Sequence, residues 1–280
     1  MKGIGGPAGS GCAEGPGSQA GSPAVNGCGA PDDPIGWTRQ TPIFVPEPVN
    51  AAPRALPPVA AGVTLWWCGL ERTAEDLTEV AALLSPAELA RAGRFGTAAL
   101  RERWMAGRAA LRTVLGRTLG IDPADVALRR GVRGRPELTG AAARVDFNVS
   151  HTRGVALVAI ARELPGQARV GVDIEHRDRE VGADRLARKF LTAAEQATLA
   201  DLPPDLGRQR FLRYWTCKEA MSKATGDGLI APFRQLDVEL ANPPRLRAGP
   251  SPYLPGDWSL HFADVPEEWL ATVAIWRPAP

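Results

Sequence analysis

The sequence lacks any hydrophobic run long enough to cross a membrane, and it has few cysteines. No apolar stretch approaches the roughly 18 residues that a membrane-spanning helix needs, and the first residues have no apolar core of the kind found in signal peptides. The four cysteines are scattered and form no C-x-x-C pair, which argues against a disulfide framework or a zinc site. We therefore expect a cytoplasmic protein that does not bind membranes.

The chain also lacks a strong excess of charge of either sign. It carries 33 Lys and Arg against 31 Asp and Glu, a net charge of +2, so a general nucleic-acid binder is not expected. The length of 280 residues and the 44% hydrophobic content are typical of a globular protein with one or two domains.

Glycine and proline are concentrated at the N-terminus. The first 57 residues contain 11 Gly and 10 Pro without a G-X-Y period, which predicts a disordered tail and excludes a collagen-like segment. We place this tail at residues 1–61 and expect the folded part to begin near Gly62.

The folded part contains two similar halves, which we assign to residues 62–168 and 169–280. Val63 and Val170 each begin an apolar strand, and 21 positions later Leu84 and Leu191 each precede a Ser/Thr-x-x-Glu capping box that begins a helix. A helix containing a tryptophan follows in both halves. Because internal repetition of this kind reflects architecture, we predict an α+β fold built as a pseudo-two-fold pair of lobes, with a ligand site between them.

One helix in the second half carries an unusual combination of residues. Trp215, Glu219 and Lys223 are spaced four apart and share one row, beside Lys218 and an apolar face that includes Cys217. Gly226 is a plausible end to the helix. This pattern suits a site for a metal ion and phosphates, but an ordinary amphipathic helix with a surface Glu–Lys pair explains it equally well. We expect Cys217 to be an inert packing residue.

The strand Val170–Glu175 places two carboxylates on one face. Alternation puts Asp173, Glu175 and Gly171 opposite the three apolar residues, with the carboxylates about 6.5–7 Å apart along the backbone. Both could bind one hard cation such as Mg²⁺, and Gly171 would leave room for a ligand. Taken alone, an exposed acidic strand end is the more economical interpretation.

A loop from Arg129 to Pro136 contains four arginines, whose forked donors suit a ligand with several phosphates. No aromatic residues are interleaved with them, which disfavours single-stranded nucleic acid. A solvated loop remains an alternative. His151, after Asn148 and Ser150, could donate to a phosphate or stack on a base, although a lone histidine is more often structural.

Together these motifs resemble a known family. Gly134-Arg-Pro, Phe147-Asn-Val-Ser-His-Thr152, Gly171-Val-Asp-Ile-Glu175 and Trp215-x-x-Lys-Glu-Ala-x-x-Lys223 occur in the order and approximate spacing of the 4′-phosphopantetheinyl transferases. The resemblance covers about residues 62 to 276 and is to the two-lobed, surfactin-synthetase-activating (Sfp-type) branch. It implies transfer of the 4′-phosphopantetheine arm of coenzyme A to a serine of a carrier protein, with release of adenosine 3′,5′-bisphosphate.

The resemblance also implies roles for individual residues. Asp173, Glu175 and Glu219 would hold Mg²⁺, with Mn²⁺ as an alternative, and Glu219 would be the base for the carrier serine, directly or through a water. Lys218 would stabilise charge on the bridging or leaving phosphate. The residues expected to bind coenzyme A are Arg91, Arg130, Arg135, Asn148, Ser150, His151 and Lys223. Where many relatives have a basic residue, this chain has Glu88, which puts one phosphate contact in doubt.

The implied partners are acyl or peptidyl carrier proteins of polyketide, non-ribosomal peptide or fatty-acid synthases, with recognition around residues 189–213. Like the two-lobed branch, the chain is expected to act as a monomer, and a role in secondary metabolite biosynthesis is implied. A non-catalytic module that binds coenzyme A or a carrier protein is one alternative, and a metal-dependent nucleotide phosphohydrolase is another. The joint presence of Asp173, Glu175, Lys218 and Glu219 disfavours the first of these.

Overall fold

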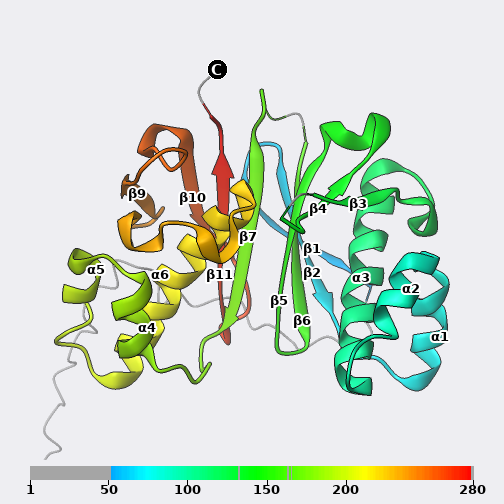
Figure 1. The fold of residues 1–280 in the computed structure, drawn as a ribbon, viewed down its shortest axis with the longest axis horizontal. Helices are drawn as coiled ribbons and strands as arrows, with labels where there is room; N and C mark the ends of the chain where they lie inside the picture. Colours follow the sequence, from blue (N-terminus) through cyan, green and yellow to red (C-terminus); the bar gives the residue numbers. More distant parts are fainter. Residues whose placement is uncertain (1–51, 132, 163, 165, 279–280) are drawn as a thin grey trace, which may run out of the picture. The chain divides into compact units, whose positions relative to one another are not determined.

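The computed structural model describes residues 52–131, 133–162, 164 and 166–278. The first lobe comprises β1 through β6 and the second comprises β7 through β11 (Figure 1). Among the described residues, no helix has the length and apolar character needed to cross a bilayer. The fold is of the mixed α+β class that the sequence predicts.

The first lobe is built on an antiparallel sheet of four strands in the order β1-β2-β6-β5. Its long helix, α3, lies against this sheet, and a short hairpin of β3 and β4 precedes β5. The elements are β1 (Arg54–Ala60), β2 (Val63–Gly69), α1 (Ala74–Ala82), α2 (Pro86–Ala92), α3 (Ala98–Leu119), β3 (Leu128–Arg130), β4 (Pro136–Leu138), β5 (Asp146–Thr152) and β6 (Val155–Ala161).

The second lobe is built on a three-stranded sheet in the order β10-β11-β7, and its long helix is α6. In β7 and β11, Asp173 lies opposite Thr272 and Glu175 opposite Leu270. The elements are β7 (Arg169–His176), α4 (Ala183–Phe190), α5 (Ala193–Ala197), α6 (Pro204–Thr225), β8 (Asp237–Glu239), β9 (Arg245–Ala248), β10 (Trp258–Phe262) and β11 (Trp269–Trp276).

The two lobes repeat one another in detail. Each has a long helix of 22 residues that ends at a glycine in the left-handed conformation, Gly120 after α3 and Gly226 after α6. The capping boxes predicted at Ser85 and Thr192 both form, and their glutamates, Glu88 and Glu195, are buried. The predicted pseudo-two-fold relationship is thus present in the helices as well as in the strands.

The apolar residues form successive layers across both lobes. One cluster fills the space between α3 and the first sheet, and another lies between α6 and the second sheet. A third cluster joins the inner faces of the two sheets and includes Val170, Val172 and Ile174 of β7. In Figure 1 the sheets accordingly lie between the two long helices.

The sheets meet at β5 and β7 through side chains rather than through a backbone ladder. Asp146 Oδ2 accepts from the Val170 N–H at 2.7 Å, and Asn148 Oδ1 accepts from the Val172 N–H at 3.2 Å. The Ser150 hydroxyl continues the series by accepting from the Ile174 N–H at 3.3 Å. Because side chains at alternate positions point to one side of a strand, β5 presents three acceptors in register with β7. We call Asp146, Asn148 and Ser150 the polar seam.

The N-terminal boundary differs from the sequence prediction. Residues Arg54–Ala60 form β1 and pair with β2, so the folded part begins before Gly62. Proline enrichment obscured this strand, because Pro57 and Pro58 cannot donate to a ladder; they are tolerated on an edge strand, which β1 is. The rest of the predicted tail, residues 1–51, lies outside the described residues.

Candidate active site

The carboxylates of β7 emerge beside α6, as alternation along the strand predicts. Val170, Val172 and Ile174 are buried between the sheets, while Asp173 and Glu175 lie on the opposite face, 4% and 7% exposed. Gly171 shares that face and lies against the backbone of α6. A Cβ at this position would lie 1.9 Å from the carbonyl oxygen of Ala220, so the glycine allows the backbone of α6 to pack on β7. The expected ligand space is therefore a helix contact.

A compact polar cluster surrounds Asp173. Its Oδ1 accepts from the Ser150 hydroxyl at 2.8 Å and from Lys223 Nζ at 2.7 Å. Lys223 Nζ also lies 2.8 Å from Ser150 Oγ. Three residues from β5, β7 and α6 thus share one network, and the sequence analysis placed all three in the site.

The other two carboxylates lie close enough to Asp173 to affect its neighbourhood electrostatically. Burial, and then the charge of Asp173, raises the pKa of Glu175 to about 7, although Arg179 pairs with it. The same two causes raise the pKa of Glu219. Buried carboxyl groups whose pKa values are raised by one another's charge are typical of functional sites.

Asp173, Glu175 and Glu219 are the residues predicted to bind a divalent cation. In the described part of the chain, no group of three or more His, Cys, Asp or Glu side chains is placed so that it could hold a metal ion. Lys223 contacts Asp173, and Arg179 contacts Glu175. However, Asp173 Oδ2 and Glu219 Oε1 are buried without a hydrogen-bond partner. Buried oxygens of this kind are costly unless a cation or donor satisfies them. The residues therefore fit a hard cation chemically.

A row of basic side chains leads to these carboxylates. One cavity of about 440 Å³ is lined by Arg91, Arg94 and Arg130 together with Phe95. A second cavity of about 420 Å³ also includes Phe95 and ends at Glu175. Its cationic or potentially cationic lining residues are Arg103, His151, Arg153 and Arg179. We call the two cavities together the basic trough.

Crowding of positive charge is evident within the trough. Burial lowers the pKa of Arg91, and Arg130, Arg108 and Arg94 lower it further. Partial burial likewise lowers the pKa of His151, with smaller contributions from Lys223 and Arg103. Because guanidinium groups pair readily with phosphate oxygens, this arrangement suits an elongated ligand with more than one phosphate.

Arg135 does not lie in the trough, contrary to the sequence analysis. It forms a salt bridge with Asp146 and donates to three backbone carbonyls, and its side chain is only 8% exposed. Asn148 is also buried in the polar seam and is not a lining residue of either cavity. In this structure both side chains hold protein segments together, and their predicted contacts with phosphate stay predictions.

Lys218 also lies outside the site. Its ammonium is fully buried and donates to Glu195 Oε2 at 2.5 Å and to the carbonyls of Phe190 and Phe233. In the first lobe, Glu88 pairs in the same way with Arg112 of α3 at 2.8 Å. The repeat therefore explains Lys218 as a buried helix-anchoring cation. The buried position of Lys218 gives no support to the predicted phosphate contact, and Glu88 pairs with Arg108 and Arg112 instead of facing the trough.

The predicted row of three residues spaced four apart on α6 is present. Trp215, Glu219 and Lys223 are half-buried on the side of α6 facing β7, whereas most of the surrounding helix is buried. Cys217 is buried, and burial raises the pKa of its thiol to about 12, in agreement with an inert packing role.

Comparison with known proteins identifies the family. Residues 169–274 match the model of the 4′-phosphopantetheinyl transferase superfamily, and residues 70–163 match the N-terminal model of 4′-phosphopantetheinyl transferases. The chain is 35% identical over 243 residues to the 4′-phosphopantetheinyl transferase HetI of Nostoc sp., covering 84% of this chain and 96% of that protein. The chain belongs to the 4′-phosphopantetheinyl transferase superfamily.

Other similarities are more distant. The 4′-phosphopantetheinyl transferase Sfp of Bacillus subtilis is 24% identical, over 59% of this chain and 70% of Sfp. A solved holo-(acyl-carrier-protein) synthase from Bacillus anthracis, in complex with coenzyme A (3′,5′-ADP), matches 39% of this chain and 96% of its own, with a TM-score of 0.30 and 20% identity. The two-lobed organisation of this family member is that of the Sfp-type branch.

Sequence reasoning missed several trough residues of this phosphopantetheinyl transferase. Arg94, Arg103, Arg153 and Arg179 line the cavities but were not singled out. Two of them were detectable: Arg153 follows the Ser-His-Thr motif, and Arg179 lies four residues after Glu175. Arg103 had no such signal, because only the packing of α3 brings it beside His151.

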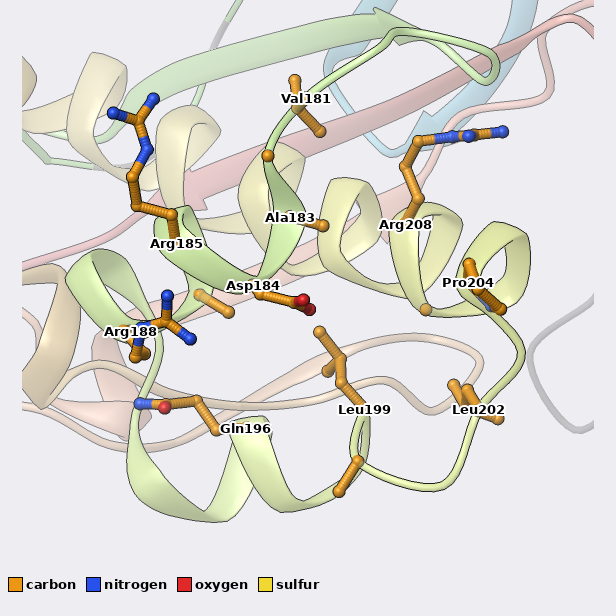
Figure 2. A pocket seen from close by; sticks show the side chains of 14 residues that line it. Val181, Ala183, Asp184, Arg185, Arg188, Gln196, Leu199, Leu202, Pro204 and Arg208 are labelled. Carbon is orange, nitrogen blue, oxygen red and sulfur yellow. The ribbon is translucent and has the colours of Figure 1, made fainter.

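A further cavity of about 720 Å³ lies in the second lobe of this family member, between α4, α5 and the start of α6 (Figure 2). None of the predicted site residues lines it. Its walls include apolar Leu199 and Leu202, and Arg185 and Arg188 are exposed on α4 beside it. We call it the α4–α6 groove.

Proposed function

We propose that the chain transfers the 4′-phosphopantetheine group of coenzyme A to a serine of an apo acyl or peptidyl carrier protein. The observation that carries this proposal is that the two basic cavities share Phe95 as a lining residue and that the second is also lined by the carboxylate of Glu175. Coenzyme A has a 3′-phosphate and a pyrophosphate, which need cations at two separate places. The trough offers cations in both cavities, at Arg91 and Arg130 in the first and at Arg103 in the second.

Asp173, Glu175 and Glu219 are the proposed ligands of Mg²⁺, with Mn²⁺ as an alternative. When bound, the ion would supply neutralisation of pyrophosphate charge, which is the main requirement of phosphoryl transfer. Support comes from the two partnerless buried oxygens and from the raised pKa values of Glu175 and Glu219.

In the proposed reaction, the carrier serine attacks the pyrophosphate of coenzyme A bound in the trough. The carrier serine oxygen forms a bond to the β-phosphorus of the pyrophosphate, and the bond from that phosphorus to the bridging oxygen breaks. Adenosine 3′,5′-bisphosphate leaves with the bridging oxygen. Glu219 takes the serine proton, directly or through a water, and its raised pKa suits this role. Lys223, held beside Asp173, is the proposed cation for the pyrophosphate.

The proposed protein partner docks on the second lobe. Arg179 lines the trough and Val181 lines the α4–α6 groove, so only one residue separates the two cavities along the chain. A carrier bound at the groove can thus present a serine to the trough. The exposed arginines of α4 favour a partner surface with acidic residues (Figure 2).

We also propose that the enzyme is cytoplasmic and acts as a monomer, serving carrier proteins of secondary metabolism. The monomer proposal is supported by the internal repeat, because both lobes that flank the site come from one chain. Equilibrium sedimentation with and without coenzyme A checks the monomer, and a dimer that dissociates only with loss of activity would overturn it.

The decisive experiment is incubation of an apo carrier protein with coenzyme A, Mg²⁺ and the purified chain, followed by mass spectrometry of the intact carrier. The expected result is an increase by one phosphopantetheine group at the carrier serine. A carrier with that serine changed to alanine is the matched control. Binding of coenzyme A without modification of acyl or peptidyl carriers would indicate a binding module. Hydrolysis of coenzyme A without a carrier would indicate a phosphohydrolase.

A further inference from the structure

All three side-chain nitrogens of Arg135 donate to acceptors, and these acceptors lie on three separate elements. Its Nη1 and Nη2 form a two-pronged salt bridge with Asp146, at 2.8 and 2.9 Å. Nη2 also donates to the carbonyls of Phe147 and Val170, at 3.0 and 2.9 Å, and Nε donates to the carbonyl of Lys223 at 3.1 Å. Asp146 and Phe147 belong to β5, Val170 to β7 and Lys223 to α6.

These three elements carry the polar cluster of the active site. Ser150 lies on β5, Asp173 on β7, and Lys223 on α6, and their side chains meet within 2.8 Å of one another. Arg135 bonds to the backbone of Lys223 itself. It also bonds to Asp146, which accepts from the Val170 N–H at one end of the polar seam. A single side chain thus fixes the relative positions of the strands and helix that supply the cluster.

The hairpin that carries Arg135 is shaped for this contact. The Gly131 N–H donates to the Arg135 carbonyl at 2.8 Å, and Gly134 has a φ of 85°, which favours glycine. Arg133 of the same turn pairs with Asp227, just beyond α6. The β3–β4 hairpin of the first lobe is therefore bound to the second lobe next to the active site.

We infer that Arg135 is a positioning residue for phosphopantetheine transfer, acting through Asp146 and the carbonyl of Lys223 rather than by contact with coenzyme A. The inference rests on the proposed function for its kinetic readout. Only a guanidinium satisfies this set of acceptors, because its donors lie in a fixed plane. A lysine at this position keeps the charge but has three donors on one flexible nitrogen, so it cannot reach β5, β7 and α6 together.

The test compares Arg135→Lys with the wild-type enzyme in steady-state transfer to a carrier protein, with direct calorimetry of adenosine 3′,5′-bisphosphate binding. We expect kcat to fall by about 10- to 100-fold, the effect of a small misplacement of reacting groups. The KM for coenzyme A and the Kd for the nucleotide should change by less than about twofold, since a charge-assisted contact would be worth more than this. Asp146→Asn should produce the same selective loss of kcat.

Arg129→Lys is the matched control, because Arg129 lies on the same hairpin, is exposed and pairs only with Glu137 among the contacts described. It should leave kcat unchanged.

In Arg135→Lys, a weakened nucleotide affinity with kcat retained would show that Arg135 contacts the ligand and would overturn the inference. A lower melting temperature with unchanged kcat and KM would reduce Arg135 to a stabilising residue and would also overturn it. If Arg135→Lys does not fold, Asp146→Asn decides by the same criteria. Absence of transfer by the wild-type enzyme would refute the proposed function instead.

Discussion

Lys223 Nζ lies 2.7 Å from Asp173 Oδ1, so a side-chain cation partly neutralises the carboxylate at the centre of the site. Glu175 has Arg179 in a similar position. Among the described residues none forms an ion pair with Glu219; its Oε1 is buried without a hydrogen bond, and burial raises its pKa. Substitution of Glu219 should therefore disturb the rest of the structure less than substitution of Asp173 or Glu175. It would still remove the proposed proton acceptor.

Glu219→Gln should abolish transfer and leave the fold intact. The amide has the shape of the carboxyl group but neither accepts the serine proton nor contributes charge to a cation, and it removes repulsion with Asp173. We expect turnover to fall by at least about 100-fold, the lower end of the range for a general base, with no decrease in melting temperature. Mass spectrometry of the carrier and thermal unfolding are the two measurements. Turnover close to that of the wild type would show that another group takes the proton.

The stability of the metal-free protein should fall as the pH rises through about 7. The pKa of Glu175 is raised from its ordinary value of 4.5 to about 7 in the folded state, so the folded protein binds a proton more tightly than the unfolded chain between these values. Stability then decreases with rising pH across this window. The melting temperature at pH 6 should exceed that at pH 8, and Glu175→Gln should reduce the difference.

Glu79→Gln provides the control for this pH series, because it removes an exposed carboxylate from α1, in the other lobe. The buffers must contain a chelator, since metal binding stabilises the ionised carboxylates and obscures the effect. An identical pH slope in the wild type and in Glu175→Gln would mean that this carboxyl does not titrate in the window.

Gly171→Ala should disrupt the packing of α6 on β7. The new Cβ would lie 1.9 Å from the Ala220 carbonyl oxygen and 2.7 Å from the Ala224 nitrogen, and both are helix backbone atoms that cannot move independently. We expect the free energy of unfolding to fall by more than about 3 kcal/mol, beyond the usual cost of overpacking, as measured by urea denaturation. Gly256→Ala is the control, because its Cβ meets nothing within 4 Å. Equal stability of the two variants would contradict the close approach.

Lys218→Met should destabilise the protein because it leaves Glu195 buried without its cation. Breaking a buried pair on one side typically costs about 3–5 kcal/mol. The double variant Lys218→Met, Glu195→Gln should recover much of the loss and retain transfer activity, since neither side chain contacts the trough or the polar cluster. Urea denaturation and steady-state kinetics of both variants test this. A stable double variant without transfer activity would restore a chemical role for Lys218.

Local sequence patterns predicted the elements of the site better than its contacts. Alternation along β7 placed Asp173 and Glu175 correctly, and helical spacing placed Glu219 and Lys223 on one row, because both depend only on neighbouring residues. The partners of Arg135 and Lys218 depend on segments up to 88 residues apart in sequence. Charge and motif order suggested phosphate contacts for these two residues, but burial against distant carbonyls and carboxylates determines what they bind.

Arg91 and Arg130 illustrate the converse case. They are 39 positions apart, yet the packing of α2 beside the β3–β4 hairpin brings them into one cavity. The family resemblance names both as coenzyme A ligands, which stays a prediction. Arg94 joins them from the same helix end. No periodicity in the sequence connects these positions, so the resemblance carried information that residue patterns alone did not contain.

Reversal of charge at the α4–α6 groove should raise the KM for the carrier protein without changing the KM for coenzyme A. Arg185 and Arg188 are exposed beside the groove, and no contact described for the chain occupies their guanidinium groups. In Arg185→Glu, Arg188→Glu we expect the KM for an acidic carrier to rise at least about tenfold, with a stronger effect at low salt. The KM for coenzyme A should stay constant, because neither residue lines the trough.

Arg234→Glu, an exposed change elsewhere in the second lobe, is the control. Equal carrier KM values in all three proteins would place the docking surface elsewhere, whereas rescue by a carrier with reversed charges would establish direct pairing.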